Sequence, residues 1–236
     1  MIVYSKSLKE FNEDVITSQI ADNIRSAFES RRLSFNVESE YRAWENSLKE
    51  MYLVLNDRDI DENIHIAIEY QIPATSKRVD FIISGLDEHN KSRAVIIELK
   101  QWEKAEKTSR EDIVTTYVGG GLRAVTHPSY QAYSYAKIIE NYNEYVEKEK
   151  VDLIPCAFLH NYKEEYREEL EYFHYQTILK LAPIYLKKDR LKLRDFIKRH
   201  IKKTDQGKLL YEIDHGKIRP SKALQDAALP PFIGPV

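Results

Sequence analysis

Three apolar, β-rich runs that follow one another closely are the feature that most constrains the fold of this chain. They are IHIAIEYQI (64–72), VDFIISGL (79–86) and AVIIELKQW (94–102). Pro73 ends the first run, and the polar segment DEHNKSR separates the other two, a pattern typical of antiparallel strands joined by a longer loop. The second and third runs are therefore expected to pair as a hairpin, with Ile83 opposite Val95.

Amphipathic helices are predicted on both sides of these strands. Apolar residues recur at helical intervals over 8–28, where Ser7 and Glu10 have capping-box spacing, and again over 40–55. The later elements are a helix that begins near Pro128, a strand over 151–159, a helix from about Lys163, a strand over 183–186 and a helix within 187–203. This order predicts an α/β fold in which helices flank a mixed sheet.

The 236 residues are enough for one domain with a sizeable core. We expect this domain to cover residues 1–205 and a C-terminal extension to cover 206–236, with a loose, proline-rich end, ALPPFIGPV. No segment has the roughly 18 uncharged apolar residues that a membrane helix needs. The single cysteine, Cys156, cannot form an internal disulfide, which favours a reducing, cytoplasmic setting.

Charge is unevenly placed on a chain whose net charge is −2. Residues 187–203 hold nine Lys or Arg against two Asp. Such a basic strip either faces a phosphate backbone or forms the solvated face of a helix, and both interpretations stay open.

Two acidic residues and a lysine lie within the second and third strands. Side chains alternate along a strand, so Glu98 and Lys100 share one face. The expected register places Asp80 opposite Glu98, with Cβ atoms about 5 Å apart. Two carboxylates at this distance repel each other unless a divalent cation lies between them. Mg²⁺ prefers such oxygen ligands, and the carbonyl of Leu99 is a further candidate ligand.

A site of this kind suits hydrolysis of phosphate esters. A divalent cation makes water easier to deprotonate and offsets negative charge on a phosphate. Lys100 would either orient or help deprotonate the attacking water, or stabilise charge in the transition state. The alternative is that these charges form pairs on the solvated face of a sheet. Their place inside two of the most apolar runs favours a site.

These residues resemble the core of the PD-(D/E)XK nucleases, whose signature is an Asp on one strand and Glu-x-Lys on the next. The resemblance implies a restriction-endonuclease-like fold and a DNA-cleaving hydrolase that uses Mg²⁺ or Mn²⁺, with Asp80, Glu98 and Lys100 as its catalytic residues. Gln131 and Tyr135 are similar to the Gln-x-x-x-Tyr element of the exonuclease branch, where they approach the active site from a helix. The alternative for these two is a stripe of core residues.

The same resemblance implies an acidic residue, often from an early helix, that completes the metal site. Glu40 is the first candidate, because it lies one turn before Trp44 on the inward stripe of the predicted helix. Glu45, rotated by about 100°, and Glu69 on the first strand are the alternatives, and the choice stays open.

More narrowly, segments such as EYRAWENSL and HPSYQAYSYA are similar to the N-terminal region of bacterial proteins that join a nuclease-like domain to a C-terminal P-loop helicase or ATPase. The resemblance spans roughly residues 1–228, but the chain has no G-x-x-x-x-G-K-[ST] motif. The chain would then be a piece of such a protein, one half of a split pair whose helicase or ATPase is a separate partner, or a stand-alone nuclease, in DNA repair or phage defence. The alternative is a non-cleaving module that binds nucleic acid or such a partner. DNA versus RNA, end versus internal cleavage and oligomeric state stay open.

Overall fold

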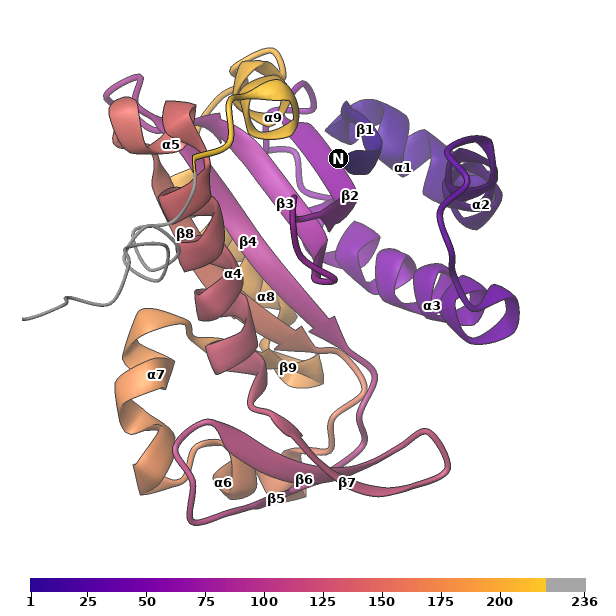
Figure 1. The fold of residues 1–236 in the computed structure, drawn as a ribbon, viewed down its shortest axis with the longest axis vertical. Helices are drawn as coiled ribbons and strands as arrows, with labels where there is room; N and C mark the ends of the chain where they lie inside the picture. The colour runs from indigo at the N-terminus through magenta and orange to yellow at the C-terminus, as the bar shows by residue number, and fades with distance from the viewer. Residues whose placement is uncertain (220–236) are drawn as a thin grey trace, which may run out of the picture.

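The computed structural model of the chain describes residues 1–219, so the predicted loose end at 228–236 lies outside the described residues. A six-stranded mixed sheet forms its centre (Figure 1). The strands, in spatial order, are β1 (Ile2–Ser7), β2 (His65–Gln71), β3 (Arg78–Leu86), β4 (Ser92–Lys100), β8 (Asp152–Leu159) and β9 (Ile184–Leu186). β4 and β8 pair in parallel, whereas β3 and β4 pair antiparallel. The predicted α/β fold is confirmed.

Helices cover both faces of this sheet. They are α1 (Leu8–Ile16), α2 (Ile20–Ser30), α3 (Val37–Leu55), α4 (Pro128–Tyr142), α5 (Glu144–Lys148), α6 (Arg167–Leu170), α7 (Gln176–Leu181), α8 (Arg190–His200) and α9 (Lys208–His215), with 3-10 turns at Glu164–Tyr166, Phe173–Tyr175 and Lys187–Asp189. Buried side chains of α1, α2, α3 and α8 form one core against the sheet, and those of α4, α5 and α9 form another on the opposite face. No helix within residues 1–219 is both long and apolar enough to cross a membrane.

The register between β3 and β4 is the one that the sequence predicts. Ile83 lies opposite Val95, and the ladder ends at Phe81 and Ile97. One step further along this register, Asp80 faces Glu98. The central strands therefore carry the two acidic residues to the same end of the sheet.

The N-terminal segment differs from the prediction in two ways. The single helix expected over 8–28 is two helices, α1 and α2, because Ser18 has a φ of 57° and turns the chain between them. The predicted capping box of Ser7 and Glu10 begins α1. β1 was not predicted. It is an edge strand, protected by Arg31 and Asp214, which bond its backbone groups.

A second, three-stranded sheet was also not predicted. It consists of β5 (Ala105–Lys107), β6 (Ile113–Val118) and β7 (Gly121–Thr126). The turn between β6 and β7 contains Gly119 and Gly120, with φ of 58° and 82°, values that glycine adopts without steric strain. The glycine-rich segment is thus the tip of a hairpin, which projects from the main sheet (Figure 1).

The segment predicted as a C-terminal extension, 206–236, contains α9. Leu209, Leu210 and Ile213 of this helix are buried in the core that also holds α4 and α5. The acidic stretch after Lys163, predicted as a helix, forms only 3-10 turns and short helices.

Candidate active site

The site begins where β3 and β4 diverge. Beyond the last pair of the ladder, the Oδ2 atom of Asp80 accepts a hydrogen bond from the backbone N–H of Leu99 at 2.8 Å. This bond takes the place of strand pairing and fixes the Asp80 carboxyl group beside β4. An acidic side chain, rather than an apolar one, therefore bridges β3 and β4 at the point where they separate.

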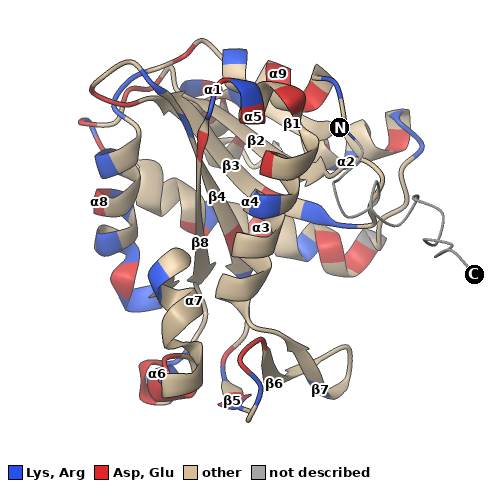
Figure 2. Cartoon of the chain, turned by 60° about the vertical axis from the view of Figure 1, so that its left-hand side comes forward, with Lys and Arg blue, Asp and Glu red and all other residues tan. Residues whose placement is uncertain are grey.

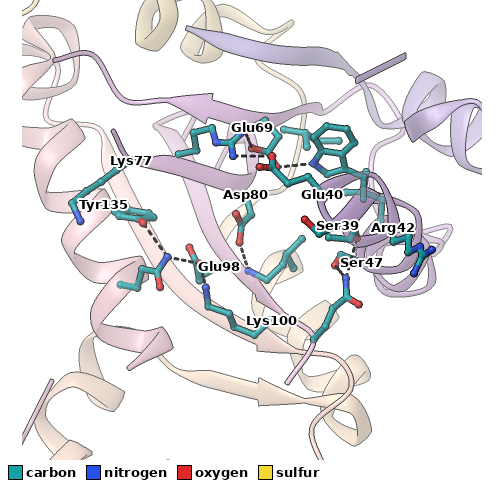
Figure 3. Close-up of a pocket in the computed structure, with 18 of the residues that line it drawn as sticks. Ser39, Glu40, Arg42, Ser47, Glu69, Lys77, Asp80, Glu98, Lys100 and Tyr135 are labelled. Carbon is teal, nitrogen blue, oxygen red and sulfur yellow. Dashed lines mark hydrogen bonds and ion pairs between the residues drawn. The ribbon is translucent and has the colours of Figure 1, made fainter. Parts of the chain in front are cut away.

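Glu98 and Lys100 lie two residues apart on β4 and share the face toward α4. The ammonium Nζ of Lys100 donates to Oε1 of Glu98 at 2.5 Å, and the amide Nε2 of Gln131 donates to the same oxygen at 2.6 Å. Gln131 also donates to the hydroxyl of Tyr135 at 2.9 Å. Gln131 and Tyr135 are one turn apart on α4, so the helix presents both to the carboxylate. Figure 3 shows this chain of contacts.

The second oxygen of Glu98 has no partner. Glu98 is only 1% exposed, and its Oε2 atom is buried without a hydrogen bond from any of residues 1–219. A buried carboxylate oxygen left unsatisfied is costly, and a proton or a cation removes that cost. The Asp80 carboxyl group lies close enough for its charge to raise the pKa of Glu98.

The pKa values of the pair follow from burial. Burial raises the pKa of Glu98 to about 8, the charge of Asp80 adds to the effect, and Lys100 opposes it. Burial also raises the pKa of Asp80, against the opposing effects of Lys100 and the Leu99 N–H. For Lys100, burial lowers the pKa, but the charges of Glu98 and Asp80 outweigh it and the net shift is upward. The site thus holds a protonated lysine beside two carboxyl groups that resist ionising together.

The oxygen atoms of this site fit a hard divalent cation as ligands. Asp80, the free oxygen of Glu98 and the carbonyl of Leu99 offer oxygen atoms only, which Mg²⁺ prefers, and Mg²⁺ commonly keeps several waters as its other ligands. Within residues 1–219, no three Asp, Glu, His or Cys side chains are grouped as ligands of one metal ion. A cation here would therefore be held by two carboxylates, with backbone and water oxygens completing its shell.

The candidate third acids are engaged with Arg78. Oε2 of Glu40 accepts from Arg78 at 2.8 Å, and Oε2 of Glu69 lies 3.3 Å from the same guanidinium, while Trp44 donates to Oε1 of Glu69 at 2.8 Å. Glu40 lines the cavity with Trp44, but the structure does not join Glu40 or Glu69 to the carboxylate pair as a three-ligand group. Glu45 does not line the cavity.

Glu69 is held in an unusual conformation. Its φ is 55°, in the left-handed region, and it is omitted from both ladders of β2 although the register would place it opposite Asp80. Burial raises the pKa of Glu69 to about 7; the charge of Asp80 adds to this and Arg78 opposes it. A strained acidic residue that interrupts a strand next to a cavity is typical of functional sites. Arg78, which holds Glu69 and Glu40, was not predicted as a site residue, although it lies two residues before Asp80.

An open cavity of 890 Å³ unites these groups. All five residues predicted as catalytic line it: Asp80, Glu98, Lys100, Gln131 and Tyr135. Figure 3 shows that the first three come from the central strands and Tyr135 from the helix beside them. Its volume lies in the range of small-molecule sites, and its open form also suits part of a larger substrate.

The basic strip at 187–203 contributes largely to folding. Arg190 pairs with Glu50 of α3, Arg194 lies 3.1 Å from Asp57, and Lys198 lies 2.8 Å from Asp59. Leu193, Phe196 and Ile197 of α8 face the core, and these cations join the helix to α3 and the loop after it. Figure 2 shows acidic and basic segments together along α8, which favours a helix face with ion pairs over one that faces a phosphate backbone.

Comparisons with known proteins return no relative. No family model, no curated protein and no solved structure matches the chain. Kinship with the PD-(D/E)XK nucleases therefore stays a prediction.

Proposed function

We propose that the chain is a divalent-metal-dependent nuclease that hydrolyses phosphodiester bonds in DNA. One observation carries the proposal. The buried carboxylate of Glu98 is fixed through one oxygen by Lys100 and Gln131, its other oxygen has no partner among residues 1–219, and Asp80 lies beside it in an open cavity. A structural ion pair has no need of a second carboxylate held at the same point.

The proposal gives each side chain a role. Asp80, Glu98 and the Leu99 carbonyl would hold Mg²⁺ or Mn²⁺, which when bound makes water more acidic and offsets phosphate charge. The bonds from Lys100 and Gln131 prevent Glu98 from turning away from its neighbour. The Lys100 ammonium, which the pair keeps charged, stabilises the negative charge that develops on phosphate oxygens.

The cytoplasm and a separate helicase or ATPase partner belong to the same proposal. The free thiol of Cys156 is buried and forms no disulfide, in keeping with a reducing compartment. The partner is supported by sequence resemblance alone.

Substitutions that keep the shape of the carboxylates test the function. Asp80→Asn and Glu98→Gln are each expected to lower Mg²⁺-dependent DNA cleavage by about 100-fold or more, because an amide is a poor ligand for a hard cation. Cleavage of linear and circular DNA is measured with Mg²⁺, with Mn²⁺ and with EDTA. Glu45→Gln, on α3 outside the cavity, is the matched control and should cleave like the parent protein.

Two results separate the alternatives. Equal cleavage by the parent and both variants would exclude these carboxylates as the active centre. Binding of DNA by the parent without metal, unchanged in Asp80→Asn and with no cleavage under any condition, would instead identify a non-cleaving module.

A further inference from the structure

A second cavity adjoins the proposed active site. It has a volume of 630 Å³ and lies between the β6–β7 hairpin and α4, lined in part by Val118, Val125 and Tyr130. We call it the hairpin cavity. It shares five lining residues with the first cavity: Lys77, Lys100, Trp102, Gln131 and Tyr135. The two cavities are therefore parts of one trough that runs from α3 past the carboxylate pair to the hairpin.

The hairpin cavity has the charge that suits a phosphate. Its lining includes Lys77 and Lys100 but no Asp or Glu, whereas the first cavity contains four acidic residues. Within residues 1–219, no carboxylate lies within ion-pair distance of Lys77, whose ammonium lies over the ring of Tyr135 at 5.6 Å from its centre. Figure 3 shows these two side chains together at one end of the site. An unpaired cation next to a metal-binding pair favours the anionic backbone of a substrate.

Its remaining surface has the character that suits a nucleobase. Tyr130 is 42% exposed, and its ring packs on no other aromatic ring among the described residues. Trp102 is half-buried at the junction of the two cavities, and Val118 and Val125 of the hairpin add apolar surface. Bases stack on such rings regardless of sequence, but a base inside a duplex is already stacked on both sides and cannot reach them.

We propose that the hairpin cavity binds unpaired nucleotides of a DNA strand next to the phosphate held at Asp80 and Glu98. The substrate is then single-stranded DNA or a frayed end rather than intact duplex. Lys77 contacts a phosphate and Tyr130 stacks on a base. The position of the reacting phosphate rests on the proposed function; the chemistry of the cavity does not.

Binding without cleavage tests this inference. Fluorescence anisotropy in EDTA compares a short single-stranded oligodeoxynucleotide with a blunt duplex of the same sequence. The parent should bind the single strand about tenfold more tightly or better. Tyr130→Ala should weaken that binding about 5- to 100-fold. Lys77→Met should reduce the slope of log K against log salt by about 0.7, the value for one phosphate contact on a single strand.

Matched controls lie at the other end of the molecule. Lys148→Met on α5 removes the same charge and Tyr211→Ala on α9 removes an exposed ring, and both should bind like the parent. As a second measurement, the oligonucleotide should quench tryptophan emission, and the quenching should be smaller in Trp102→Phe.

Failure of this inference can be distinguished from failure of the proposed nuclease function. Equal or tighter binding of duplex, no binding of the single strand, or cavity variants that bind like their controls would each overturn the inference, whether or not the protein cleaves DNA. Single-strand binding that depends on Tyr130 and Lys77, without metal-dependent cleavage, would support the inference while removing the proposed nuclease.

Discussion

Glu98 destabilises the metal-free protein because it is buried next to a second carboxyl group. Its pKa is raised from 4.5 to about 8, so the folded chain binds one more proton than the unfolded chain between these values. Folding stability from this site is therefore fully present below pH 4.5 and is lost as the pH rises toward 8. Groups placed for catalysis commonly carry such a cost.

Glu98→Gln should remove this dependence of folding stability on pH. The amide keeps an oxygen for Lys100 and Gln131 and replaces the partnerless oxygen by an N–H group that can donate to Asp80. We expect the variant to gain stability over the parent by a few kcal/mol as the pH rises from 5 to 9. The measurement is urea unfolding across that range in EDTA. Excess Mg²⁺ should reduce the difference by stabilising the parent alone. A difference that does not change with pH would show that Glu98 ionises freely.

The helix α4 depends on its N-cap, His127. His127 is fully buried. Its Nδ1 atom accepts a hydrogen bond from the backbone N–H of Ser129 at 3.2 Å, and its Nε2 atom lies 3.0 Å from the carbonyl oxygen of Leu170. Both contacts require the neutral ring with its proton on Nε2. Burial lowers the pKa of His127 from 6.5 to about 4. Protonation would therefore remove the cap of the helix that carries Gln131 and Tyr135.

Lowering the pH should thus destabilise α4 and lower the free energy of unfolding. Between pH 6.5 and about 4 the unfolded chain binds a proton that His127 does not, so stability falls as the pH is lowered through this window. His127→Asn keeps a capping side chain but cannot titrate. The slope of unfolding free energy against pH, measured between pH 6 and 5, should be smaller in the variant by about 1 kcal/mol per unit. His160, whose pKa burial also lowers to about 4, remains in both proteins, so identical slopes would mean that His127 is not the group responsible.

Structure that depends on neighbouring residues could be predicted from this sequence, and pairings between distant segments could not. The β3–β4 register follows from two alternating runs and the loop between them, and the capping box of α1 from residues three apart. β1 pairs with a strand some sixty residues away and lies at an edge, so no neighbouring segment indicates it. Arg78 was missed for the same reason, since its partner Glu40 lies on a separate helix 38 residues earlier.

The C-terminal boundary shows the same limit, because helical periodicity does not reveal which core a helix joins. Leu209, Leu210 and Ile213 are each at most 2% exposed and belong to the core shared with α4, in which α9 adjoins α5, β3 and β4. A chain that ends at the predicted domain boundary, residue 205, would lack α9 and expose the core surface that this helix covers.

Truncation at that boundary should therefore be strongly destabilising. Losing three buried aliphatic side chains, at about 1.5–3 kcal/mol each, is expected to cost at least about 5 kcal/mol. A chain ending at Arg219 keeps α9 and every described contact, and it should unfold at the same urea concentration as the full protein. The control Tyr211→Ala changes an exposed residue of the same helix and should cost little. If the chain ending at 205 is as stable as the one ending at 219, α9 is an appendage; if it unfolds, the helix is part of the domain that holds the carboxylate pair.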